Sequence, residues 1–130
     1  MQIHFTATPP ADVRLHARLV NQGAALTGLD AVIVEGAAAS AFAGRAAQVF
    51  EGFASVGGAV KRIALAGAGE AGAADRRAHH ERAGAALTAK YLVSGETAMV
   101  LDLGGAGLSA DDAAAVLLAL RLRAWRHDAY

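Results

Sequence analysis

Residues 63–72 read IALAGAGEAG, and the interpretation of this stretch decides the fold. An apolar run over residues 59–66, the strongest strand signal in the chain, leads into the pattern G-x-G-x-x-G. This pattern is typical of the turn that holds a dinucleotide pyrophosphate between a strand and a helix. The alternative is a plain loop between a strand and a helix, in a chain that contains 15 glycines.

The nucleotide interpretation needs further features, and the sequence supplies only some of them. Asp102 stands near the end of the next expected strand, where an acid that binds a ribose could lie. However, the first residue able to cap the following helix is Asp75, three residues after Gly72. The pyrophosphate would then not lie on the helix N-terminus. The sequence therefore favours the plain loop and predicts no cofactor-binding residue.

Outward from this stretch, alternation and turn residues predict the other elements. Val56-Gly57-Gly58 separates two apolar runs and predicts a β-hairpin. Ser109 and the two acids that follow it, Asp111-Asp112, fit the start of a helix. Strands are expected over residues 2–6, 12–20, 45–55, 59–66 and 97–103, and helices over residues 75–91 and 109–127.

Residues 29–40 are ambiguous at the local level. Ala31-Val32-Ile33-Val34 is rich in β-branched residues and favours a buried strand. The alanines that follow favour a helix. Local propensity leans slightly to a strand, while the order of the surrounding elements predicts an α/β sandwich with a mixed sheet, in one domain over residues 1–130.

Composition narrows the function classes. Lys and Arg together number 12, as do Asp and Glu, and this neutral balance argues against a nucleic-acid partner. The chain has no cysteine and no apolar leader at its N-terminus, and its longest apolar run, 113–120, is too short to span a membrane. These features predict a cytoplasmic protein with neither a membrane nor a nucleic-acid partner.

Neither a catalytic nor a metal-binding residue is predicted. His79 and His80 are adjacent, which does not place both rings on one helix face as a zinc site requires, so we expect a solvated helix face. Ser94 and Ser109 lack the G-x-S-x-G pattern of a nucleophile elbow. The arginine pair Arg76-Arg77 and the set Arg121, Arg123 and Arg126 are expected to be solvated or interface charges.

The last expected helix has two unusual features. Its middle, residues 113–120, is apolar all round, so more than one of its faces should be buried. Trp125 and Tyr130, two of the few aromatic residues, stand at its end. They either pack back on the sheet or face another domain.

Three pieces of the chain carry a resemblance. They are FAGRA at residues 42–46, KRIALAGAG at 61–69 and LRLRAWRHDAY at 120–130. In this order they resemble the N-terminal domain of the leucyl aminopeptidase (cytosol aminopeptidase) family. The last piece is the most specific, since it is similar to the R-x-W/Y-R-x-D-x-Y end of the helix that leads into the family's catalytic domain.

The resemblance implies a three-layer, macro-domain-like α/β fold with a mixed, mainly parallel central sheet flanked by helices. The resemblance implies that residues 29–40 form a helix, against the slight local preference for a strand, and we adopt the helix as our prediction. It also makes Gly67-Ala68-Gly69 a strand-end turn, although Gly72 has no counterpart in the family pattern. The family's two divalent ions, Zn or Mn, belong to a C-terminal domain whose N-T-D-A-E-G-R signature this chain lacks.

The resemblance therefore implies a non-catalytic domain, inactive alone. Its expected partners are its own C-terminal catalytic domain and further copies in a homo-hexamer. Its expected role is in assembly and in access to the active sites of an enzyme that removes N-terminal amino acids from peptides. Two alternatives remain open: a stand-alone module that binds a nucleotide or ADP-ribose, and an assembly domain that has lost its enzyme.

Overall fold

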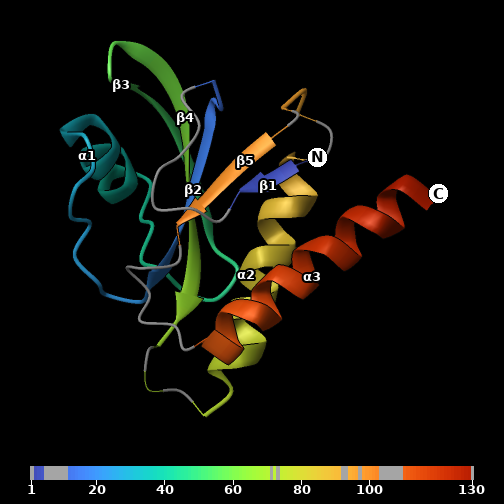
Figure 1. Cartoon of the computed structure of the whole chain (residues 1–130). Helices are drawn as coiled ribbons and strands as arrows, with labels where there is room; N and C mark the ends of the chain where they lie inside the picture. Colours follow the sequence, from blue (N-terminus) through green and yellow to red (C-terminus); the bar gives the residue numbers. More distant parts are fainter. Residues whose placement is uncertain are drawn as a thin grey trace.

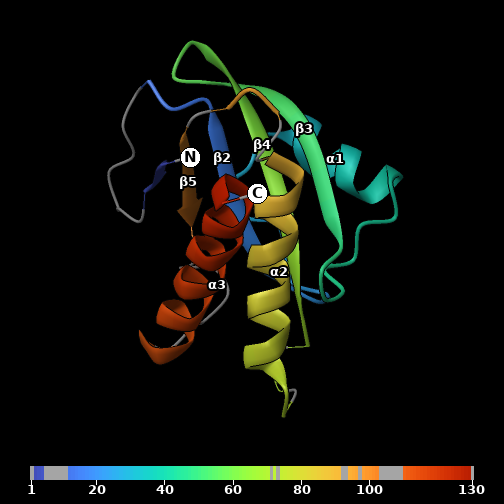
Figure 2. The same cartoon turned by 90° about the vertical axis from the view of Figure 1, so that its right-hand side faces the viewer.

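The fold is a three-layer α/β domain, seen in a computed structural model that describes residues 2–4, 12–70, 72, 74–91, 94–96, 98–102 and 110–129. Helix α1 (Ala31–Ala39) covers one face of a five-stranded sheet. Helices α2 (Arg76–Tyr91) and α3 (Ala110–Ala129) cover the other face (Figures 1 and 2). The layered α/β class expected from the sequence is confirmed.

The sheet has the strand order β1-β5-β2-β4-β3. All neighbours are parallel except the antiparallel pair β3–β4, so the sheet is mixed and mainly parallel, as expected. The strands are β1 (Gln2–His4), β2 (Leu15–Asn21), β3 (Val49–Val56), β4 (Ala59–Gly69) and β5 (Ala98–Asp102).

The hairpin between β3 and β4 forms at the expected glycines. Gly57 and Gly58 have φ of 60° and 83°, the left-handed backbone that a tight hairpin turn requires at both central positions. β3 begins at Val49 and not near residue 45, because Gly44 and Ala47 have left-handed φ values of 81° and 64° that interrupt the extended backbone. β4 in turn runs on to Gly69, three residues beyond the expected end.

Strand β2 has the expected alternation. Leu15, Ala17 and Leu19 are buried against α2 and α3, while His16 and Arg18 on the other face are half-buried. A parallel strand in the middle of a sheet is covered on both faces, so its polar face is only partly solvated.

Within residues 29–40, Ala31–Ala39 form helix α1, so the local preference for a strand is wrong and the helix implied by the resemblance is confirmed. Asp30 caps the helix, since its Oδ1 accepts a hydrogen bond of 2.9 Å from the Val32 amide. Ile33 and Ala37 are buried against β3 and β4, while Val32 points to solvent. The cap and the tertiary packing outweigh the β preference of three β-branched residues.

The alanine-rich composition allows helices to approach closely. A Cβ on Gly84 of α2 would lie 3.2 Å from Val116 Cγ1 of α3, tighter than most real contacts. Val116 and Leu120 of α3 are fully buried and belong to one core with Ala83 and Leu87 of α2. Helix α3 begins at Ala110, and the expected capping residue Ser109 lies outside the described residues. Among the helices that the structure describes, none is long and apolar enough to cross a membrane.

Candidate functional site

The fold has one place where an α/β protein commonly binds a ligand. α1 follows β2 on one face of the sheet, and α2 follows the adjacent strand β4 on the other face. Where two neighbouring parallel strands send their connections to opposite faces, a crevice forms at their carboxyl ends. The glycine-rich stretch at the end of β4 lies at this point.

In this protein the segment 42–48, which we call the plug, fills that crevice. The Gly67 amide donates to the Gln48 carbonyl at 2.7 Å, and the Gly69 amide donates to the Gly44 carbonyl at 3.0 Å. The Ala47 amide donates in return to the Gly67 carbonyl at 3.0 Å. A Cβ on Gly67 would overlap the carbonyl oxygen of Arg45. Glycine is required there because two backbones meet, not because a phosphate does.

This arrangement favours the plain interpretation of the glycine pattern. A phosphate cradle needs free backbone amides, and those of Gly67 and Gly69 already bind the plug. α2 begins at Arg76, four residues after Gly72, and a Cβ on Gly72 would meet open space. Asp102 forms an ion pair with Arg18 across 3.7 Å. Gly67-Ala68-Gly69 is thus the last part of strand β4, not the turn that the resemblance implied, and its backbone binds the plug.

The plug is held by a side chain that sequence reasoning missed. Gln48 Oε1 accepts from the Ala43 amide at 2.9 Å, and its Nε2 donates to the Ala41 carbonyl at 3.2 Å. Ala41 and Ala47 have φ of 59° and 64°, a left-handed backbone that costs an alanine about 1–2 kcal/mol. A glutamine before a strand has no special sequence signal, so only the three-dimensional contacts show its role.

The expectation that His79 and His80 form a solvated helix face is wrong. His80 is 2% exposed, and the His79 side chain is mostly buried, with Nε2 3.1 Å from Asp75 Oδ2. His79 lies over Gly69: a Cβ on that glycine would come within 2.7 Å of the His79 Nδ1. The histidines are covered because α2 packs against the sheet along the face that carries them. In the part of the chain described here, no three His, Asp or Glu side chains cluster to hold a metal ion.

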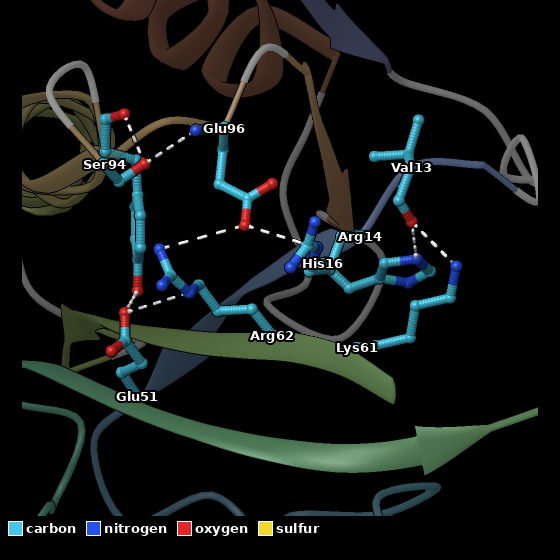
Figure 3. A network of polar contacts seen from close by, with 9 residues as sticks. Val13, Arg14, His16, Glu51, Lys61, Arg62, Ser94 and Glu96 are labelled. Carbon is cyan, nitrogen blue, oxygen red and sulfur yellow. Dashed lines mark hydrogen bonds and ion pairs between the residues drawn. The ribbon is translucent and has the colours of Figure 1, made fainter. Parts of the chain in front are cut away.

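A polar cluster lies at the opposite end of the strands, where the parallel strands begin (Figure 3). Arg62, near the start of β4, lies between two carboxylates: its Nε is 3.9 Å from Glu51 Oε2, and its Nη1 is 3.9 Å from Glu96 Oε1. The same Glu96 oxygen is 3.7 Å from Arg14 Nε. We call these residues, with Tyr91, the Arg62 cluster.

Aromatic rings complete the Arg62 cluster. The Arg62 guanidinium lies 5.2 Å from the centre of the Phe53 ring and 5.8 Å from that of Tyr91. The Tyr91 hydroxyl donates a 2.6 Å hydrogen bond to Glu51 Oε2. The cluster thereby joins β3, β4 and the end of α2. Its charges face one another, which is typical of a structural brace.

A short turn positions Glu96 in this brace. The Ser94 hydroxyl donates to the Tyr91 carbonyl at 2.8 Å and accepts from the Glu96 amide at 3.2 Å. Ser94 is thus a turn residue, consistent with its lack of a nucleophile motif. Beside the cluster, Lys61 Nζ and His16 Nε2 both lie within hydrogen-bond distance of the Val13 carbonyl, at 3.0 and 3.1 Å (Figure 3).

Tyr91 should make stability depend on alkaline pH. Burial first, and then the hydrogen bond to Glu51, raise the pKa of Tyr91 above its usual 10.0. Above pH 10 the folded protein keeps the phenolic proton that the unfolded chain loses, so the free energy of unfolding should fall by about 1.4 kcal/mol per pH unit. Urea unfolding at pH 9 and pH 11 measures this loss. The Tyr91→Phe variant should lack it, and an equal loss in both proteins would contradict the prediction.

Other residues singled out in the sequence lie on the two helices α2 and α3. Arg77 of α2 and Asp111 and Arg121 of α3 are exposed. The side chains of Arg76, Asp112, Arg123, Trp125 and Arg126, and the whole of Tyr130, lie outside the described residues. The prediction that Trp125 and Tyr130 pack back on the sheet or face another domain therefore stays a prediction.

Comparison with known proteins agrees with this picture. A family model described as the cytosol aminopeptidase family, N-terminal domain, matches residues 16–130. No curated protein matches the chain. The matched range includes the plug, the glycine-rich strand end, the Arg62 cluster except Arg14, and helices α1, α2 and α3. The chain therefore belongs to the cytosol aminopeptidase family, whose N-terminal domain it contains.

Proposed function

We propose that this chain is the non-catalytic N-terminal domain of a metal-dependent leucyl aminopeptidase that removes N-terminal amino acids from peptides. In this proposal the two divalent ions, Zn or Mn, belong to a separate C-terminal catalytic domain. The domain described here contributes to assembly of a cytoplasmic homo-hexamer and to access to its active sites. Support comes from the family match, from the plug that fills the ligand crevice, and from the surface of α3.

The surface of α3 is the observation that carries the proposal. Val116 and Leu120 face α2 and are buried, whereas Leu118 and Leu122, four residues apart on another side of the helix, are 59% and 46% exposed. Ala114, one turn earlier, is also exposed and continues the stripe. Among the α3 side chains that the structure describes, Val116 and Leu120 pack in the core with α2, and Leu118 and Leu122 stay exposed.

The position of α3 suits a contact with another domain. The helix lies against α2, and its C-terminal half extends beyond the sheet (Figure 1). Residues 120–130 of this helix carry the sequence that resembles the family's link into the catalytic domain. We infer that the Ala114, Leu118 and Leu122 stripe packs against that catalytic domain, where burial of the exposed parts of the two leucines would contribute roughly 1.5–3 kcal/mol.

The 130-residue chain alone should self-associate through the exposed apolar stripe of α3. Its mass by light scattering should rise above 13.1 kDa with concentration, because exposed apolar side chains pair with one another. The double variant Leu118→Glu/Leu122→Glu should stay at the monomer mass. Val60→Glu, which alters a similarly exposed residue on the hairpin, is the matched control and should still associate. A wild-type monomer at all concentrations would contradict the prediction.

Two further measurements distinguish specific docking on the catalytic domain from non-specific association. The immobilised chain should retain the catalytic domain of a cytosol aminopeptidase, and the double glutamate variant should not. The chain alone should not hydrolyse leucine p-nitroanilide with Zn²⁺ or Mn²⁺ present. Hydrolysis that co-purifies with the chain would overturn the non-catalytic assignment.

A further inference from the structure

A pocket of about 390 Å³ lies on the other face of the domain, away from α3 and from the Arg62 cluster. Its walls come from α1, including Val34 and Ala38, and from the loop that follows β2, including Ala24 and Leu26. Val20, at the end of β2, also lines it. The pocket thus lies at the carboxyl end of a central parallel strand, beside the crevice that the plug fills, and its volume is typical of small-molecule sites.

The lining is neutral. All of the residues that form the pocket are described, and none of them carries a charge. Most are aliphatic, and Phe42 adds an aromatic ring that packs on Phe50 with their centres 6.4 Å apart. An ionised ligand would lose its hydration here without a compensating charge. The walls therefore favour an uncharged, apolar ligand.

Three backbone carbonyls at the end of α1 are already used. The carbonyls of Gly36, Ala37 and Ala38, which end α1, accept from the amides of Ser40, Phe42 and Ala41 at 2.9–3.1 Å. The C-terminus of α1 therefore offers few free carbonyl oxygens to a cation, and the helix dipole disfavours an anion there.

The loop across the pocket offers few donors as well. The Gln22 and Gly23 amides donate to the carbonyls of Gly69 and Ala43 at 2.8 and 3.0 Å. The Ala24 amide donates to the Asn21 carbonyl at 3.1 Å. Three successive amides that could form an anion-binding nest are thus directed to the protein itself.

We propose that this pocket binds a neutral aromatic molecule of about two fused rings. The pocket is open to solvent on one side, and its volume of about 390 Å³ admits a ring system larger than benzene. The Phe42 ring in the wall favours an aromatic ligand through edge or offset contacts. This site differs from a phosphate-binding nucleotide site, because the chemistry of its lining selects against anionic groups.

A pair of fluorescent probes tests the proposal on the full chain. N-phenyl-1-naphthylamine is neutral, and 1-anilinonaphthalene-8-sulfonate has the same rings with an added sulfonate. The neutral probe should bind saturably at one site per chain and be displaced by indole. The sulfonate should bind at least tenfold more weakly. Absence of saturable binding, or stronger binding of the sulfonate, would overturn the proposal.

Variants on the two walls locate the site. Ala38→Trp on α1 and Ala24→Trp on the facing loop should each weaken the neutral probe at least tenfold, because both residues are exposed and line the pocket. Ala39→Trp, one position further along α1 and outside the lining, is the matched control and should change binding less than twofold. The Leu118→Glu/Leu122→Glu variant should also bind normally. If both wall variants, shown to be folded by circular dichroism, bind normally, or if the α3 variant loses binding, the assignment is wrong.

Discussion

Replacing Gly67 by alanine is expected to lower the free energy of unfolding by about 3–5 kcal/mol, a loss at the upper end for a single methyl group. The new Cβ would overlap the Arg45 carbonyl oxygen, and backbone cannot rotate aside as a flexible side chain can. Relief requires that the plug move, which strains or breaks the hydrogen bonds between Gly67 and the residues Gln48 and Ala47. Urea unfolding followed by circular dichroism measures the loss.

Gly72, the third glycine of the same G-x-G-x-x-G pattern, provides the control. A Cβ there would meet nothing within 4 Å, and its φ is outside the left-handed region. Gly72→Ala should therefore change stability by less than about 1 kcal/mol, with a small gain expected from the less flexible unfolded chain. If the two variants were equally stable, the plug would not be held against β4 as described. The comparison separates a close approach of two backbones from a general need for glycine in a loop.

The second large effect is expected in the Arg62 cluster. Arg62→Met keeps the apolar stem but removes the charge between Glu51 and Glu96, whose side chains are only 28% and 12% exposed. Two partly buried carboxylates would then repel each other and lose a common partner, at a cost of about 2–3 kcal/mol. The guanidinium contact with the Phe53 and Tyr91 rings is lost as well.

Arg14→Met is the matched control for this variant. Arg14 contacts the same Glu96 oxygen at 3.7 Å, but its side chain is 64% exposed against 21% for Arg62. An exposed ion pair contributes little, so a loss below about 1 kcal/mol is expected. Equal losses for the two arginines would show that the cluster acts as ordinary surface charge and not as a brace.

These two sites bear on the role of the domain. The plug fills the crevice at the carboxyl ends of the strands. The Arg62 cluster joins the elements at the opposite end, around the start of β4. A domain stiffened at both ends of its central sheet suits a scaffold that presents surfaces. In the proposed function that surface is the apolar stripe of α3, and a charge-bearing variant there should disturb assembly while leaving the fold intact.

Most of the secondary structure could be predicted because it rests on local chemistry. Alternation over Leu15, Ala17 and Leu19 predicted β2, the glycine pair Gly57-Gly58 predicted the hairpin, and the resemblance of three short pieces predicted the family. The apolar middle of α3 also predicted more than one buried face, of which the structure shows one.

The roles of single residues were decided by tertiary structure alone. Local propensity leaned to a strand for the segment that Asp30 caps as a helix, and an exposed surface was expected for His80, which is buried. Gly67 meets Arg45 across 22 positions of sequence, and Tyr91 meets Glu51 across 40. Spacing along the chain reports which face of an element a residue occupies. It does not report which distant backbone or charge will lie against that face, since that depends on how the layers pack.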